Sequence, residues 1–429
     1  MSCINHKQSV LLFSQIEKNA IDLADFIQSH KKSLEDVLLT YESSEVVEDE
    51  INRTIDLLEN ILENRTYFTQ SICSTFVFLP RNQPLYALFC FAVIPSFMSD
   101  KVFIKRPSSY GKIFDTLIKI FKTSSSLDNI YVFTGSRNSF LNMVNAKTHT
   151  HFCGGRSVIF TGTGKNAHDI SQQINKKILF IANGSSHNPI VVSHDASVTD
   201  AVDAVLKVKV YNSGQDCAAP NSILVHSDVY TDFMKQLKNA LKKISVGSYL
   251  NIQNRIGPLS DKKSIYFAQN IIAGNKQWID QDFSGSFLSS NTMKPLLISR
   301  PLALGGGYSE SYAPIFFVQE YPRDQDLKIY FEHTLYIENA GYISVFGSSD
   351  YINKLTFKKI GKNKVSRLLH PKETILNNTN LHAPGIERGI KPYGGYGKSS
   401  SFVSYQGKKT YMPTLVQRDI FNFLIKPSI

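Results

Sequence analysis

The sequence has few of the residues that mark secreted or metal-binding proteins. Its 429 residues contain 5 cysteines, and no two of them form a CxxC pair. An odd number of cysteines without such pairs argues against a disulfide framework and against a cysteine-rich zinc site. We therefore expect no metal centre, a reducing compartment and a cytoplasmic location.

Long hydrophobic runs and nucleic-acid motifs are also missing. The most apolar stretch, residues 85–98, is shorter than the roughly 20 apolar residues that span a membrane. The opening MSCINHKQS lacks the basic and apolar segments of a secretory signal. The formal net charge is +11, but there is no arginine-rich arm and no RNP-type aromatic motif. We expect neither a membrane nor a nucleic acid among the partners.

What is present predicts a large folded core. Hydrophobic residues make up 42% of the chain and aromatic residues 11%, which excludes a disordered protein. Apolar residues recur at helical spacing through residues 1–65, which predicts helices there. From Ser74 onward, short β-branched or aromatic runs alternate with helical stretches. This alternation predicts βαβ units and a doubly wound, mostly parallel sheet.

A second series of strands and helices begins near Lys176, after which the chain passes through a Gly/Ser/Asn-rich joint at residues 183–188. We expect an α/β fold of two domains with a hinge near residue 185. The first domain is expected at residues 1–185, and the chain is expected to return to it at about residues 350–408. A catalytic domain is expected at residues 186–350. Residues 409–429 are expected to contain an oligomerisation strand, formed by the run 412–425.

Two segments carry residues suited to covalent chemistry. Cys217 follows a predicted helix and Gly214 and precedes a strand, a common place for an exposed nucleophile. Asn82 lies in the polar tip that closes the strand at residues 75–79, where its amide could donate a hydrogen bond to a developing oxyanion.

Other segments suit a dinucleotide. Lys105 ends a strand at the carboxyl edge of the predicted parallel sheet, where dinucleotides bind. Gly162 and Thr163 lie between another strand and a helix, a place for pyrophosphate. Glu310 and Tyr312 precede a later strand, and residues 392–399 form a glycine-rich loop.

Taken in order, these segments resemble motifs of the aldehyde dehydrogenase superfamily, over nearly everything from residue 15 to the end. FNxGQxC is similar to residues 211–217, PWNFP to 80–84, the lysine of LKPSE to Lys105, FTGS to 160–163, GPLIS to the start of 257–263, EIFGP to 310–314, and PFGGYKxSG to 392–400.

The resemblance implies an oxidoreductase that uses NAD or NADP. Cys217 would attack an aldehyde and form a thioester, and the Asn82 amide with the Cys217 backbone N–H would hold the oxyanion. Lys105 and Glu310 would contact the adenosine and nicotinamide riboses. The resemblance also implies cofactor contacts from Arg106, Ser108, Gly162, Thr163 and Tyr312.

One departure concerns the family's general base, a glutamate in the segment LELGGKNP. Asn183 stands at that position, and an amide cannot take a proton from water. Three interpretations follow. In the first, a thiol, either coenzyme A or a group on a carrier protein, takes the acyl group from the thioester, or the enzyme runs in reverse and reduces an acyl thioester. In the second, Asp216 or His187 supplies the base. In the third, the protein is a binding or structural relative that does not catalyse the reaction.

Further departures affect the cofactor, the substrate and the assembly. The acid of KPSE, which repels a 2′-phosphate, is absent here, and Arg106 stands nearby, which favours NADP over NAD. The tryptophan of PWNFP is replaced by Arg81, which could contact an anionic substrate or plug the tunnel. Only residues 64–74 remain where the family carries extra β structure, so we expect a homodimer.

Overall fold

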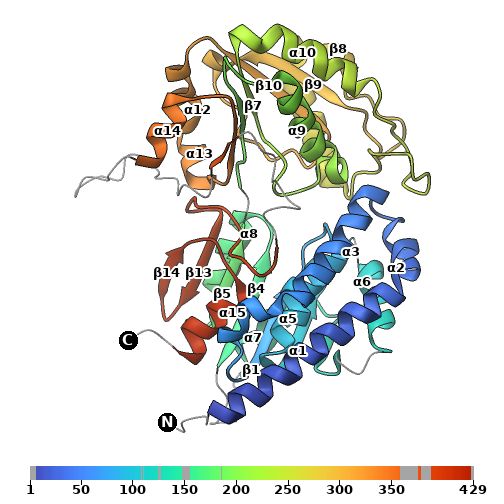
Figure 1. The fold of residues 1–429 in the computed structure, drawn as a ribbon, viewed down its shortest axis with the longest axis vertical. Helices are drawn as coiled ribbons and strands as arrows, with labels where there is room; N and C mark the ends of the chain where they lie inside the picture. The colour runs from blue at the N-terminus through green and yellow to red at the C-terminus, as the bar shows by residue number, and fades with distance from the viewer. Residues whose placement is uncertain are drawn as a thin grey trace.

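Two seven-stranded sheets form the frame of the protein, one in the lower and one in the upper half of Figure 1. The computed structural model describes residues 6–107, 109, 111–123, 127–146, 155–184, 186–357, 375–377 and 388–426. The chain leaves the first sheet after Asn183 and enters the second at Ile190. The hinge expected near residue 185 falls on Ser185, which lies outside the described residues.

The first sheet has the order β14-β13-β5-β4-β1-β2-β3. Its strands are β1 (Ile72–Phe78), β2 (Ser99–Lys105), β3 (Ile130–Phe133), β4 (Arg156–Thr161), β5 (Leu179–Asn183), β13 (Ser401–Tyr405) and β14 (Lys408–Tyr411). The strands β1 to β5 are parallel, and β13 and β14 extend the sheet in antiparallel pairing. Because β1 to β5 are parallel, their carboxyl ends lie at one edge of the sheet.

Helices cover both faces of this sheet. One face packs against α1 (His6–Ser29), α2 (Lys31–Leu38), α3 (Ser44–Glu59) and α6 (Gly111–Phe121), and the other against α7 (Arg137–Asn145) and α8 (Gly164–Gln173). The blue N-terminal helices in Figure 1 lie beside α5 (Ile94–Ser96) and α6. The apolar spacing predicted these helices correctly, because Ile16, Leu23 and Ile51 are buried in the core that they form.

The second sheet has the order β12-β11-β6-β7-β10-β9-β8. Its strands are β6 (Ile190–Val192), β7 (Ile223–His226), β8 (Ile279–Ser284), β9 (Leu296–Pro301), β10 (Ile315–Tyr321), β11 (Ile343–Phe346) and β12 (Ile375–Asn377), and only the pairing of β8 with β9 is antiparallel. One face carries α9 (Val198–Val210) and α10 (Ser227–Leu241); the other carries α12 (Lys328–Phe331), α13 (Thr334–Asn339) and α14 (Asp350–Phe357). A smaller core lies under α11 (Lys262–Gly274). The doubly wound α/β class is therefore confirmed.

The chain returns to the first sheet later than expected. Tyr351 and Leu355 of α14 are buried in the core of the second sheet, and β12 pairs with β11 there. A return beginning at about residue 350 is therefore wrong, because the apolar side of α14 is already covered by the second unit. The chain is back at the first unit by Arg388, which pairs with Asp56 of α3, and Ile390 lies in the first core.

The strand expected at residues 412–425 is also wrong. The segment forms α15 (Val416–Ile420) and a π-helical turn (Phe421–Ile425). Val416 and Ile420 lie one helical turn apart and are buried in the first core, while Asp419 accepts a 3.0 Å hydrogen bond from the Leu415 N–H at the start of the helix. These apolar side chains are covered by the chain's own core, so they offer no support for pairing with a partner. The homodimer stays a prediction.

The cysteines are not all alike. Cys73 is disulfide-bonded, which the cysteine count did not predict, whereas Cys90 and Cys217 are reduced.

Within the described part of the chain, no helix is long and apolar enough to cross a membrane. No group of three or more His, Cys, Asp and Glu side chains that could hold a metal occurs among the described residues.

Candidate active site

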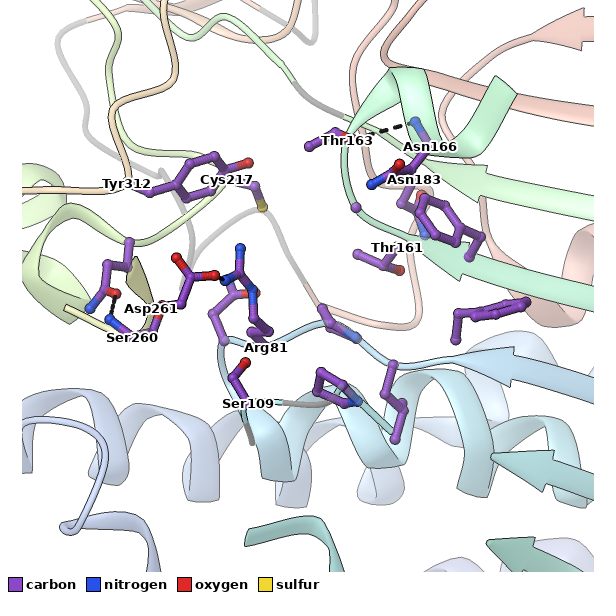
Figure 2. Close-up of a pocket in the computed structure, with 18 of the residues that line it drawn as sticks. Arg81, Ser109, Thr161, Thr163, Asn166, Asn183, Cys217, Ser260, Asp261 and Tyr312 are labelled. Carbon is purple, nitrogen blue, oxygen red and sulfur yellow. Dashed lines mark hydrogen bonds and ion pairs between the residues drawn. The ribbon is translucent and has the colours of Figure 1, made fainter. Parts of the chain in front are cut away.

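A cavity of about 800 Å³ lies at the carboxyl edge of the first sheet, facing the second unit. From the first unit it is lined by the ends of β1, β2, β4 and β5; from the second it is lined by Cys217, Tyr312 and residues 260–264. Figure 2 shows Cys217 and Tyr312 across the cavity from Thr161 and Asn183. Small-molecule sites commonly have volumes of about 300 to 1,000 Å³, so the cavity is large enough for a cofactor.

A second cavity of about 80 Å³ adjoins the first. The two cavities share Cys217, Asn82, Asn183 and Tyr393. The rest of the smaller cavity is mostly apolar, with Ala87, Cys90, Leu415 and Val416 in its walls. The thiol and two side-chain amides therefore stand where the large cavity meets the small one.

A strained turn brings Cys217 to this junction. After α9 ends, Asn212, Ser213 and Gly214 have φ values of 47°, 57° and 71°, in the left-handed region. A Cβ on Gly214 would lie 2.3 Å from the carbonyl oxygen of Ala313, so only glycine fits. The Gly257 N–H donates a 2.8 Å hydrogen bond to Ser213 Oγ, which helps to hold the turn. Such strain persists only where surrounding contacts enforce it, and it is concentrated at functional sites.

The contacts of Cys217 fix both its backbone and its thiol. Its carbonyl oxygen accepts hydrogen bonds from Asn188 Nδ2 at 3.0 Å and from Ser186 Oγ at 3.4 Å. Its Sγ lies 3.0 Å from the hydroxyl of Tyr393, within hydrogen-bonding distance. Sequence reasoning did not single out Tyr393. The only signal was its place beside the glycines of the PFGGYK-like loop.

The three residues predicted to be catalytic come together. Asn183 ends β5, is 5% exposed, and accepts a hydrogen bond from Thr414 Oγ1 through its side-chain oxygen. Asn82 follows β1 and is half-buried. Both line the two cavities together with Cys217.

The two alternative bases lie elsewhere. The Asp216 carboxylate accepts hydrogen bonds from the Ala218 N–H at 2.7 Å and from Gln83 Nε2, and it is buried. His187 is also buried, and this burial lowers its pKa to about 4. Neither residue is among the described residues that line the two cavities. The interpretation in which Asp216 or His187 activates water therefore has no geometric support.

Most of the predicted cofactor residues do line the large cavity. Lys105 and Arg106 lie there at the end of β2, with the Arg106 guanidinium paired to Asp115 of α6. Gly162 and Thr163 line it at the start of α8, where Thr163 Oγ1 accepts from the Asn166 N–H at 3.4 Å. Ser108 lies outside the described residues.

Glu310 is placed differently from its neighbour Tyr312. Tyr312 lines the large cavity, whereas Glu310 is not among the described lining residues. The Glu310 carboxylate accepts 3.0 Å hydrogen bonds from the Ser186 N–H and from the Tyr312 hydroxyl. Burial, followed by the charge of Glu310, raises the pKa of Tyr312, so its hydroxyl keeps its proton. In this arrangement Glu310 orients Tyr312, and its expected contact with the nicotinamide ribose has no direct support.

Arg81 crosses the large cavity. Its guanidinium forms an ion pair with Asp261, the N-cap residue of α11, as Figure 2 shows. Arg81 lines the large cavity but is not among the described residues that line the small one. It therefore does not plug the small cavity.

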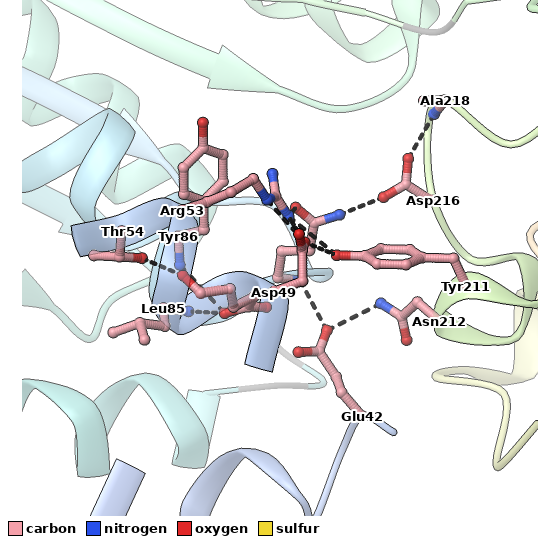
Figure 3. Close-up of polar contacts among 12 residues, drawn as sticks. Glu42, Asp49, Arg53, Thr54, Leu85, Tyr86, Tyr211, Asn212, Asp216 and Ala218 are labelled. Carbon is pink, nitrogen blue, oxygen red and sulfur yellow. Dashed lines mark hydrogen bonds and ion pairs between the residues drawn. The ribbon is translucent and has the colours of Figure 1, made fainter. Parts of the chain in front are cut away.

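A buried polar network joins the N-terminal helices to both loops of the site (Figure 3). At its centre, Arg53 of α3 is 6% exposed and bonds Asp49 at 2.7 Å, Gln83 Oε1 at 2.8 Å and Tyr211 Oη at 3.0 Å. Gln83 follows Asn82 directly, and Tyr211 begins the turn that leads to Cys217. The network therefore fixes the two loops relative to each other, which nothing in the sequence pattern predicted.

Two carboxyl groups extend this network. Glu42 accepts hydrogen bonds from the Gln83 N–H at 3.0 Å and from Asn212 Nδ2 at 2.9 Å. Glu50 accepts one from the Leu85 N–H at 2.9 Å. Burial raises the pKa of Glu42 and, together with the neighbouring Glu42 charge, raises that of Glu50 further. One proton on the pair would remove one buried charge while both carboxyls keep their hydrogen bonds to the loops.

Known proteins resemble this chain in sequence. The sequence profile of the aldehyde dehydrogenase family matches residues 31–329. A succinate-semialdehyde dehydrogenase (NADP(+)) of Escherichia coli is 32% identical over 119 residues, which cover 28% of this chain and 25% of that protein. A glutarate-semialdehyde dehydrogenase of Pseudomonas putida is 27% identical over 163 residues, which cover 37% of this chain and 34% of that protein. These alignments thus span only a quarter to a third of the length of the relatives.

Solved structures share the fold. An NADP-dependent glyceraldehyde-3-phosphate dehydrogenase from Bacillus halodurans C-125 superposes with a TM-score of 0.70 at 16% identity, covering 94% of this chain and 85% of that one. A salicylaldehyde dehydrogenase from Pseudomonas putida G7 gives a TM-score of 0.71 at 15% identity, covering 90% and 81%. Such low identities show the shared fold alone. Because the family profile matches well over half of its residues, the chain belongs to the aldehyde dehydrogenase family.

Proposed function

We propose that this protein is an NAD(P)-dependent oxidoreductase that interconverts an aldehyde and an acyl thioester through Cys217. The observation that carries the proposal is the junction of the two cavities at Cys217, Asn82 and Asn183. The large cavity has room for a dinucleotide and carries cationic side chains such as Lys105 and Arg106, and the small cavity, whose walls are mostly apolar, suits the apolar part of an aldehyde.

Within this proposal each residue has a role in acylation. The Cys217 thiolate attacks the aldehyde carbon, and the carbonyl electron pair moves to the oxygen. Asn82 Nδ2 and the Cys217 backbone N–H stabilise that oxyanion. The bound nicotinamide supplies the hydride acceptor, and a thioester on Cys217 remains. Lys105, Gly162 and Thr163 would hold the dinucleotide, with its pyrophosphate at the N-terminus of α8.

The cavity walls favour NADP. Ser109, near the position of the missing acid, lines the large cavity, and so do the cationic side chains of Arg106 and Arg137. No carboxylate of that segment is left to repel a 2′-phosphate. Binding of the phosphate would compete with Asp115 for the Arg106 guanidinium.

Replacing Arg106 should therefore affect the two cofactors differently. We expect Arg106→Gln to raise the dissociation constant for NADP by about tenfold and to leave that for NAD nearly unchanged, because a hydrogen bond to a charged group contributes roughly 1.5 to 3 kcal/mol. Isothermal titration calorimetry measures both constants. Lys119→Gln, on the exposed side of α6, is the matched control. Equal losses for both cofactors would contradict the NADP preference, and binding of neither cofactor to the unmodified protein would contradict the enzyme proposal.

Asn183 decides how the thioester is resolved. Its side chain lines both cavities but has no basic group, and Asp216 and His187 lie outside them. We infer that a thiol such as coenzyme A takes the acyl group, or that an acyl thioester is the substrate of the reverse reaction. Turnover of an aldehyde with NADP should then require an added thiol, and steady conversion to free acid without one would contradict this inference.

Substitution of Asn183 tests the same inference about thioester resolution by changing the protein and not the acceptor thiol. We expect Asn183→Glu to raise the rate of thioester hydrolysis about a hundredfold, since a positioned general base contributes roughly 10² to 10⁴. Asn183→Gln is the control of equal length without a base and should hydrolyse no faster than the unmodified protein. The rate is read as free acid released from a preformed acyl-Cys217 protein. No difference between the two variants would rule out a missing base as the cause of slow hydrolysis.

The partners in this proposal are a small aldehyde or acyl thioester, delivered free or on a carrier protein, and a second copy of the chain. Sedimentation measures the expected homodimer directly.

A further inference from the structure

The hydroxyl of Tyr393 lies against the sulfur of Cys217. The two atoms are 3.0 Å apart, and Tyr393 lines both cavities. Its backbone is held by paired 2.9 Å hydrogen bonds with Thr414, in which each residue's N–H donates to the other's carbonyl. Gly394 follows with a φ of 113°, and a Cβ there would lie 2.3 Å from Ser401 Oγ. The tyrosine is therefore placed by a rigid part of the loop.

The chemistry of the pair determines which atom donates. A tyrosine hydroxyl ordinarily has a pKa near 10 and a cysteine thiol one near 8.5, so the thiol loses its proton first. A thiolate can only accept hydrogen bonds, and the phenol must then donate. A hydrogen bond made to the charged form of a group favours that form.

We propose that Tyr393 is a further catalytic residue, whose hydroxyl stabilises the Cys217 thiolate by donating a hydrogen bond to Sγ. The proposal rests on the proposed function, in which Sγ is the reacting atom. The loop supplies this donor beside a thiol that must act as both nucleophile and leaving group.

The same hydrogen bond would act when the thioester is broken. An acceptor thiol loses its proton to solvent, and its sulfur adds to the thioester carbonyl. The bond between the acyl carbon and Sγ then breaks, and its electron pair returns to Sγ, where the Tyr393 hydroxyl donates to it again. A sulfur with a lower pKa leaves faster. With Asn183 in place of a base, Tyr393 thus makes the leaving group more reactive.

Other ionisable groups lie in the same cavity or next to Cys217 in sequence. Tyr312, whose pKa is raised by burial, then by Glu310 and by charge on Cys217, lines the large cavity, as do Arg81 and Asp261. The Asp216 carboxylate, one residue before Cys217, is turned toward Gln83. All of them remain in a Tyr393→Phe protein, which loses one oxygen atom and keeps the ring. A difference in the reactivity of Cys217 between the unmodified and the Tyr393→Phe protein therefore reports the effect of the hydroxyl.

The test is the pH dependence of Cys217 alkylation by iodoacetamide in the full chain, with the modified peptide identified by mass spectrometry. We expect the midpoint to rise by roughly one to two pH units in Tyr393→Phe, because a hydrogen bond to a charged group is lost. Tyr396→Phe, three residues along the same loop and beside the Tyr342 ring, is the control and should keep the original midpoint.

A second measurement separates the hydroxyl's effect from a folding defect. Transfer of an acyl group from Cys217 to added coenzyme A should be slower in Tyr393→Phe than in Tyr396→Phe, at equal thermal midpoints of unfolding. An unchanged alkylation midpoint in Tyr393→Phe would overturn the proposal. Alkylation needs neither cofactor nor turnover, so this outcome is distinct from failure of the proposed function, which cofactor binding and acylation report.

Discussion

A Cys217→Ser protein is expected to lose thioester-type acylation by at least about a thousandfold, because an unactivated hydroxyl is a far weaker nucleophile than a thiol. Serine is close to cysteine in size, so the strained turn before residue 217 should persist. Intact-mass measurement after incubation with an aldehyde and NADP, or with an acyl thioester, detects the adduct. The unmodified protein should gain one acyl group per chain and the variant none.

The control for this experiment is Cys90→Ser. Cys90 is reduced and lines the small cavity, but it is not among the described residues lining the large one. The Cys90→Ser protein should still form the adduct, and peptide mapping should locate the acyl group on Cys217. An adduct of normal yield in Cys217→Ser would refute the assignment. Absence of any adduct in the unmodified protein would favour the competing hypothesis of a binding or structural relative.

Replacing Arg53 with methionine is expected to destabilise the protein by about 3 to 5 kcal/mol, the cost of removing one partner from a buried ion pair. Methionine keeps the length of the side chain but leaves the Asp49 carboxylate without its 2.7 Å contact to the guanidinium. Gln83 and Tyr211 lose their hydrogen bonds to Arg53 as well. Because these two residues position Asn82 and Cys217, acylation should slow at temperatures where the variant is still folded.

Urea unfolding followed by tryptophan fluorescence and circular dichroism measures the loss. Arg255→Met is the matched control, since Arg255 pairs with Glu45 at 3.1 Å on the surface, where such pairs contribute about 0 to 1 kcal/mol. In a second comparison, Asp49→Asn added to Arg53→Met should recover part of the stability by removing the unpaired charge. Equal costs for the Arg53 and Arg255 variants would contradict a central role of the network.

The sequence predicted several of the residues that line the large cavity, because its pattern marks strand ends. Asn82, Lys105, Thr163 and Asn183 all stand at or just after strands that the alternation of apolar runs revealed, and parallel strands bring their carboxyl ends to one edge. The sequence pattern did not predict the direction in which each side chain points. Asp216 directly precedes Cys217, and Glu310 is two residues before Tyr312. Neither carboxylate lines the cavities among the described residues, because Asp216 accepts hydrogen bonds from the Ala218 N–H and Gln83, and Glu310 accepts them from the Ser186 N–H and the Tyr312 hydroxyl.

By itself the sequence determined the family, the α/β class, the strand ends that carry Asn82 and Asn183, and the loop between a helix and a strand that carries Cys217, since these follow from local motifs and from apolar periodicity. Only the tertiary structure decided that residues 416–425 are helical, that Arg53 joins both loops of the candidate site, and that Tyr393 lies against the Cys217 thiol. The physical reason is distance along the chain. Arg53 and Tyr211 are 158 positions apart, and Cys217 and Tyr393 are 176 apart. Such distant contacts leave no local periodicity, and they arise only when the two sheets and their loops have packed together.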